Sequence, residues 1–184
     1  MRVIRARPMP GQARPGQSSG LGPAREIVVA AAHGGAGATT LAILLQPAWD
    51  LGAPRRTGRG LPPILLDGRP VVLVARNTVA AAGQAVNAVN VITAPGGRIA
   101  VLAIVSDGFP EPPEASYRFC LLEPRIGGLV RVPFVPLLRV TDRPAGVRLP
   151  GQARAALAEI RARTTAPIPN AQPESPLTTA RVNN

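Results

Sequence analysis

The feature that most constrains the fold is a glycine-rich segment held between two apolar runs. The first run, Ile27–Ala30, contains only Ile, Val and Ala, and the second, Leu41–Leu45, contains only Leu, Ile and Ala. Between them, residues 31–40 read AAHGGAGATT. A continuous aliphatic run is typical of a strand covered on both faces in a parallel sheet, and the glycines after it allow a tight turn into a helix. We therefore expect a strand over 26–32, a glycine loop, and a short helix over 39–45.

The rest of the folded sequence repeats this alternation. Further strands are expected at 71–75, 99–105 and 130–135, and further helices at 78–91, 115–122 and 152–163. Thr78 can cap the first of these helices with its hydroxyl oxygen. The expected buried face of that helix consists of Val79, Ala82, Val86 and Val89. Strands that alternate with helices predict an α/β fold with a mainly parallel sheet, here of about four or five strands.

The segment Ile64–Leu66, followed by Asp67 and Gly68, allows two interpretations. Asp-Gly between apolar runs is typical of a β-hairpin turn. Alternatively, Asp67 ends a strand and holds a metal ion. Because the next strand is expected to begin at Val71, no room is left for a crossover helix, and the turn is favoured. The stretch 49–63 is expected to be a loop, since it is rich in Gly, Pro and Arg.

Composition sets the domain organisation. The chain has 184 residues, of which 46% are hydrophobic and 3% aromatic, so one aliphatic core is feasible. Residues 1–24 are rich in Arg, Pro and Gly, and residues 164–184 have the same polar, proline-rich character. Both are expected to be disordered tails, because they can bury little apolar surface. The folded domain is expected over residues 25–163.

The net charge and the rare residue types limit the kinds of partner and metal site that the chain can have. The net charge is +11 and all 21 basic residues are arginine, which fits either nucleic-acid binding or the codon bias of a GC-rich genome. One cysteine, Cys120, and one histidine, His33, exclude an intramolecular disulfide and a Cys/His metal cluster. Cys120 is expected in the core. Without a long apolar run or a secretory signal, the protein is expected to be cytoplasmic.

The glycine loop is the candidate binding site. Its glycines let successive backbone N–H groups converge on an anion, as in phosphate-binding loops. The candidate ligands of a phosphate or nucleotide are Gly34, Gly35, Gly37, Thr39 and Thr40. Thr39 is also the candidate ligand of Mg²⁺, which would accompany ATP or GTP. Ala38 stands where a phosphate-binding lysine is expected. A purely structural role, as a tight strand-to-helix turn, stays open.

Two further side chains are candidates for the same site. His33 precedes the glycines and could donate to a phosphate, or it could simply end the strand. Arg76 follows the strand at 71–75, so it is expected at the carboxyl edge of the sheet, where ligands of parallel sheets bind. The alternative is a solvated arginine that precedes a helix cap.

The segment AHGGAGATTL, residues 32–41, resembles the deviant Walker A loop of ParA/MinD-type ATPases, whose pattern is KGGxGKTT. The glycines and both threonines match, while His33 and Ala38 stand in the places of the two lysines. This resemblance implies a reduced P-loop NTPase-like sheet and a homodimer or a partner protein. The segments HGGAGATTLA, VVLVARNTVAAAGQA, IAVLAIVSDGFP and VRVPFVPLLR resemble P-loop-like proteins of GC-rich bacteria that are often associated with conjugative and integrative elements.

The expected function is a binding or regulatory module of P-loop type that hydrolyses nucleotide weakly or not at all. The lysine that would neutralise the β/γ-phosphates is missing, and no catalytic residue is assigned. One alternative is an ATPase that uses an arginine, such as Arg76, in place of the lysine. Another is a basic scaffold associated with DNA or a membrane surface.

Overall fold

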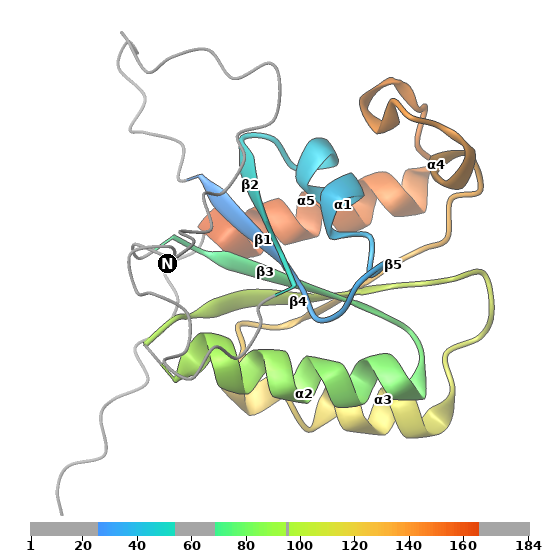
Figure 1. Ribbon diagram of the computed structural model, residues 1–184. Helices are drawn as coiled ribbons and strands as arrows, with labels where there is room; N and C mark the ends of the chain where they lie inside the picture. Colours follow the sequence, from blue (N-terminus) through green and yellow to red (C-terminus); the bar gives the residue numbers. More distant parts are fainter. Residues whose placement is uncertain (1–25, 54–68, 95, 166–184) are drawn as a thin grey trace, which may run out of the picture.

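Five strands pair in one sheet, in which every strand is parallel to its neighbours (Figure 1). The structure is a computed structural model that describes residues 26–53, 69–94 and 96–165. The strands are β1 (Ile27–Ala31), β2 (Ala48–Gly52), β3 (Val71–Arg76), β4 (Ile99–Val105) and β5 (Leu129–Val132), in the order β2-β1-β3-β4-β5. The predicted α/β fold with a parallel sheet is confirmed.

Helices cover both faces of this sheet. They are α1 (Ala38–Leu44), α2 (Val79–Thr93), α3 (Pro113–Cys120), α4 (Leu137–Val140) and α5 (Gly151–Thr165). Figure 1 shows α1 and α5 on one face and α2 and α3 on the other. None of these helices, within the described ranges, is both long and apolar enough to cross a bilayer.

The central strands are apolar on both sides because each side packs against helices. In β3, Val72 and Val74 belong to the core beneath α1 and α5, whereas Val71 and Leu73 belong to the core beneath α2 and α3. All four side chains are fully buried. Burial on both faces explains why the run is continuous rather than alternating, as expected for a parallel sheet.

Helix α2 begins where the capping pattern predicts. The Thr78 hydroxyl oxygen accepts a hydrogen bond of 3.2 Å from the Ala81 N–H. Ala82 and Val89 are buried as expected, whereas Val79 and Val86 are only half-buried. The remaining buried residues of the helix are Ala81, Ala85, Ala88, Val91 and Ile92, three of which are alanine. Alanine there lets the helix lie close to the sheet.

The last helix also matches its pattern. Leu157 and Ile160 are buried, and Arg154 and Arg161 are exposed. Arg161 donates a hydrogen bond of 2.8 Å to the Leu44 carbonyl at the end of α1. Helices α1 and α5 are therefore joined on the same face of the sheet.

The loop predicted at 49–63 is wrong at its beginning, because residues 48–52 form the edge strand β2, parallel to β1. The segment is short and contains Asp50, so it lacks the aliphatic run of a buried strand. A side-chain contact also fixes the position of β2: Trp49 Nε1 donates a hydrogen bond of 2.6 Å to the Glu26 carboxylate. The guanidinium of Arg69 lies 5.5 Å from the centre of the Trp49 ring. Residues 54–68 lie outside the described ranges.

The hairpin predicted around Asp67 lies outside the described residues and stays a prediction. Strand β3, which follows it, pairs with β1 along one edge and with β4 along the other. The alternative role of Asp67 as a metal ligand stays a prediction for the same reason. The strand predicted at 130–135 already ends at Val132, before Pro133.

Cys120 was expected in the core but is exposed. It is the last residue of α3, and the neighbouring Phe119 is fully buried in its place. The larger aromatic side chain therefore occupies the space between α3 and the sheet.

The strand order places a topological switch point between β1 and β3. From β1 the chain passes through α1 to β2 on one side, whereas β3, β4 and β5 follow on the other side. In doubly wound sheets, ligands bind beyond the carboxyl ends of the strands at such a point. The glycine loop after β1 and Arg76 at the end of β3 both lie there.

Candidate functional site

The glycine loop, residues 32–37, connects β1 to α1 at the switch point. Gly35 has φ of 76° and Gly37 has φ of 95°, both in the left-handed region that favours glycine. These two glycines are therefore required by the backbone conformation itself.

Gly34 is different from the other two glycines of the loop. Its φ lies outside the left-handed region, and a Cβ atom added there would meet nothing within 4 Å. Neither conformation nor packing within the described chain requires glycine at this position. The open space above its backbone is the space that a bound group would need in order to approach the loop closely.

The backbone N–H groups of the loop are mostly open. The loop is anchored by the Ala32 N–H, which donates 2.8 Å to the Val74 carbonyl of β3. Within the described part of the chain, the N–H groups of Gly34, Gly35 and Gly37 donate to no protein acceptor. Gly34 and Gly35 are exposed. This arrangement can supply several donors to one anion.

His33 is held by contacts within the chain. Its Nδ1 atom lies 2.9 Å from the Gly34 carbonyl oxygen, and its Nε2 atom lies 3.3 Å from the Arg76 backbone nitrogen. Each ring nitrogen thus faces a backbone group of the same chain. His33 therefore ties the loop to the end of β3, and neither of its ring nitrogens is left for a phosphate.

Arg76 reaches from β3 over the glycine loop. Its Nε atom donates a hydrogen bond of 3.0 Å to the Gly35 carbonyl, and the side chain is half-buried. This contact holds the guanidinium beside the loop and leaves its two terminal amino groups for other acceptors. The predicted position of Arg76 at the carboxyl edge is confirmed.

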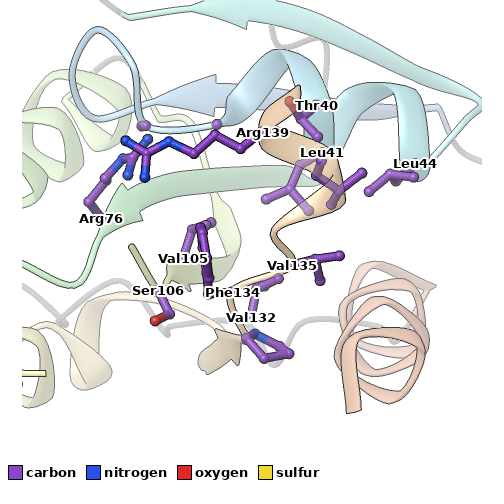
Figure 2. Close-up of a pocket in the computed structure, with 14 residues that line it drawn as sticks. Thr40, Leu41, Leu44, Arg76, Val105, Ser106, Val132, Phe134, Val135 and Arg139 are labelled. Carbon is purple, nitrogen blue, oxygen red and sulfur yellow. The ribbon is translucent and has the colours of Figure 1, made fainter. Parts of the chain in front are cut away.

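A second arginine lies at the same place. Arg139, from α4, lines the same pocket as Arg76, and Figure 2 shows the two side chains directed toward one another. Among the described residues, no carboxylate lies within 4 Å of either guanidinium. Two cations that share a pocket without a protein counter-charge favour an anionic ligand.

Thr39, in the first turn of α1, is exposed. Its hydroxyl donates a hydrogen bond of 2.6 Å to one carboxylate oxygen of Asp50, on β2. The other Asp50 oxygen accepts 2.9 Å from the Gly52 N–H. A hydroxyl and a carboxylate fit Mg²⁺ only together with phosphate oxygens and water, the way in which this ion usually binds. No cluster of three or more acidic, His or Cys residues occurs in the described ranges.

Next to the loop, a pocket of about 120 Å³ opens between α1, the ends of β4 and β5, and α4 (Figure 2). Thr40 and Gly37 line it on the loop side. Most of the remaining lining is apolar, from Leu41, Leu44, Val105, Val132, Phe134, Val135 and Leu138. The glycine loop, the two arginines and this pocket therefore form one continuous site.

The sequence indicated part of this site and missed two residues. Of the predicted residues, Gly37, Thr40 and Arg76 line the pocket, and Arg76 contacts the Gly35 carbonyl. Gly34 and Thr39 do not line it, and Thr39 is hydrogen-bonded to Asp50. Asp50 was missed because it lies in a segment expected to be a loop. Arg139 was missed because no local pattern marks it: its position depends on how the chain folds back after β5.

No protein-family model matches the sequence, and no curated protein is significantly similar to it. The likeness to ParA/MinD-type loops therefore rests on residues 32–41 alone, and the function must be argued from the site.

Proposed function

We propose that the protein is a P-loop-like binding or regulatory module that holds a phosphate group at the glycine loop without efficient hydrolysis. The observation that carries this proposal is the set of open N–H groups at the switch point, with Arg76 fixed beside them. A full positive charge and several backbone donors then face the same bound group. The open space above Gly34 supports the same conclusion.

Weak or absent turnover follows from the charges at the loop. Ala38 takes the lysine position at the beginning of α1. Arg76 can offset phosphate charge, but its Nε is tied to the Gly35 carbonyl, so it cannot follow the γ-phosphate freely as charge develops. Asp50 already accepts from Thr39 and Gly52, so it is poorly placed to activate a water molecule.

A second candidate is an ATPase in which Arg76 takes over the role of the missing lysine. The hydrogen bond between Arg76 and the loop favours it, because the guanidinium lies where a bound phosphate would need it. Thr39 and Asp50 would then hold Mg²⁺ together with ATP or GTP. Release of phosphate from ATP–Mg²⁺ that disappears in Arg76→Gln would favour this candidate over a non-hydrolytic module.

The cellular setting is proposed on the sequence alone. A cytoplasmic location and a nucleic-acid partner follow from composition, and a homodimer or protein partner from the resemblance of residues 32–41. A plasmid or conjugative-element context follows from the resemblance of the four longer segments quoted above. The arginine-rich segment 1–25 and the proline-rich segment 166–184 lie outside the described residues.

Calorimetric titration of the full chain with inorganic phosphate, ATP–Mg²⁺ and GTP–Mg²⁺ tests the proposal. We expect saturable binding of at least inorganic phosphate at millimolar concentration or below. Gly34→Glu should abolish it, because the added carboxylate would occupy the open space above the loop and repel the anion. Gln84→Glu, on the exposed side of α2, changes the net charge equally and should leave binding unchanged. Absence of heat with all three ligands would contradict the proposal.

A further inference from the structure

We infer that the ligand of this site is a phosphate monoester with a short apolar substituent, which fills the pocket beside the glycine loop. This inference rests on the proposed function and specifies its ligand class. It follows from three features of the pocket: its apolar walls, its size and the charges at its mouth.

The walls are aliphatic and come from separate elements. Leu41 and Leu44 line the pocket from α1, Val132 from β5, Val135 from the segment after it, and Leu138 from α4. The sheet contributes Val105 at the end of β4. Such a surface gains free energy by covering apolar groups and offers few partners to the polar edges of a base or a sugar.

The size of the pocket limits what it can cover. A cavity of ~150 Å³ with a similar lining accepts benzene. The pocket here measures about 120 Å³ and is open on one side, so a short aliphatic chain or a small ring fits. Pockets that enclose drug-sized ligands measure ~300–1,000 Å³, so a nucleoside would remain mostly outside.

The positive charges at the opening of the pocket favour an anionic group at the other end of the ligand. Arg76 and Arg139 line the same pocket that the apolar side chains line, and Thr40 and Ser106 add hydroxyl groups there. A phosphate placed between the two guanidinium groups would lie next to the open N–H groups of the glycine loop. Its substituent would then be directed toward the aliphatic walls.

A neighbouring pocket shows why this arrangement is specific. It shares Ser106, Val132 and Pro133 with the first pocket and contains Arg131. Arg131, however, donates to both oxygens of Glu111, at 3.0 Å and 2.9 Å, and these hydrogen bonds raise the pKa of Arg131 above its ordinary value. Its charge is thus already matched within the chain, which leaves Arg76 and Arg139 as the pair that favours an anion.

The test is a chain-length series on the full-length protein. Inorganic phosphate, methyl, ethyl and butyl phosphate, and ATP–Mg²⁺ are titrated by calorimetry under one set of salt conditions. Burial of each methylene should tighten binding about fourfold, so butyl phosphate should bind tens-fold more tightly than methyl phosphate. Equal affinity for inorganic and butyl phosphate would overturn this inference and leave the proposed function standing. Tighter binding of ATP–Mg²⁺ than of butyl phosphate would overturn it in favour of a nucleotide.

Two variants locate the effect. Leu138→Asn, in the wall, should reduce the gain per methylene to less than twofold and leave inorganic phosphate unaffected, whereas Leu121→Asn, at an exposed leucine beyond α3, should change neither. Arg139→Gln should weaken every phosphate about tenfold with the gain per methylene unchanged. An unaltered gain in Leu138→Asn would overturn the assignment of the pocket. Failure of every phosphate to bind the unmodified protein would overturn the proposed function as well.

Discussion

Two turns at the carboxyl edge of the sheet differ in whether their backbone N–H groups are hydrogen-bonded within the chain. One is the glycine loop after β1, and the other is the turn after β4, residues 106–110, which we call the β4 turn. Both contain glycines with positive φ, at 76° and 95° in the first and at 102° in the second. The glycines alone therefore do not distinguish a binding loop from a structural turn.

The β4 turn satisfies its own donors. Asp107 accepts 3.0 Å from the Phe109 N–H, and Ser106 accepts 3.2 Å from the Gly108 N–H. The side chain of Asn77, which is 4% exposed, accepts 3.1 Å from the Asp107 N–H and donates 2.9 Å to the Phe109 carbonyl. A Cβ at Gly108 would lie 3.3 Å from the ring of Phe134. This turn is closed by side chains and packing.

In the glycine loop, side chains contact backbone carbonyls rather than the N–H groups of Gly34 and Gly35. The N–H groups of Gly34 and Gly35 donate to no acceptor among the described residues, and a Cβ at either residue would meet nothing within 4 Å. Arg76 contacts a loop carbonyl rather than an N–H group, so it adds positive charge and leaves the donors open. The difference between the turns lies in what surrounds the glycines. It favours the glycine loop over the β4 turn as the proposed phosphate site, and the β4 turn contributes Ser106 to the neighbouring pocket.

The largest effect is expected from Asn77→Ala. The substitution removes a buried side chain that makes two hydrogen bonds to the β4 turn, so the free energy of unfolding should fall by about 2–3 kcal/mol. Urea denaturation measures the loss. Phosphate affinity of the folded fraction should stay the same, and Asn87→Ala, at an exposed position of α2, should change stability by less than about 0.5 kcal/mol.

Arg76→Gln should act on binding and hardly on stability. The loss of a charge-assisted contact should weaken phosphate by about 1.5–3 kcal/mol, or roughly ten- to a hundredfold, as measured by calorimetry. Arg154→Gln, on the exposed side of α5, removes the same charge far from the loop and is the matched control. An equal loss in both variants would mean that only the net charge matters.

Gly108→Ala should destabilise the protein without a change in phosphate affinity. A left-handed conformation is unfavourable for alanine, and the new methyl group would crowd Phe134, so the expected loss is about 1–2 kcal/mol in thermal or urea unfolding. Ser106 and Phe134 already line the pocket, so the readout is inorganic phosphate. Weaker binding of inorganic phosphate in this variant would show that the β4 turn also contributes to the anion site itself.

Gly34→Ala should show the opposite behaviour, with the smallest effect. Stability should change by less than about 0.5 kcal/mol, because the added methyl group meets nothing and the backbone is not left-handed. Phosphate should bind several-fold more weakly, since the methyl group occupies the approach to the open N–H groups. Unchanged affinity would indicate that the ligand does not approach the loop over Gly34.

Much of the fold could be predicted from local patterns. The strands β1, β3 and β4 are continuous aliphatic runs, and Thr78 marks the beginning of α2 by its capping hydroxyl. Strand β2 could not be predicted, because an edge strand needs little apolar sequence and depends on pairing with β1. The exposed position of Cys120 was missed for a related reason: helical spacing does not show which of two adjacent residues the sheet will cover.

The candidate site likewise contains residues that local sequence patterns predict and residues that they do not. The glycine loop and the place of Arg76 follow from the order of residues along the chain, since a strand end in a parallel sheet fixes the edge at which its next residues lie. Arg139 and Asp50 are brought to the loop by tertiary packing, one through α4 and the other through β2.

The sequence by itself therefore determined an α/β sheet and a loop able to present its backbone to an anion, because burial patterns and glycines act locally. Only the tertiary structure decided that this loop stays open while the β4 turn closes. Only it placed a second arginine and an aliphatic pocket beside the loop. Those properties depend on residues far apart in the sequence, whose distances are set by the strand order and the packing of the helices.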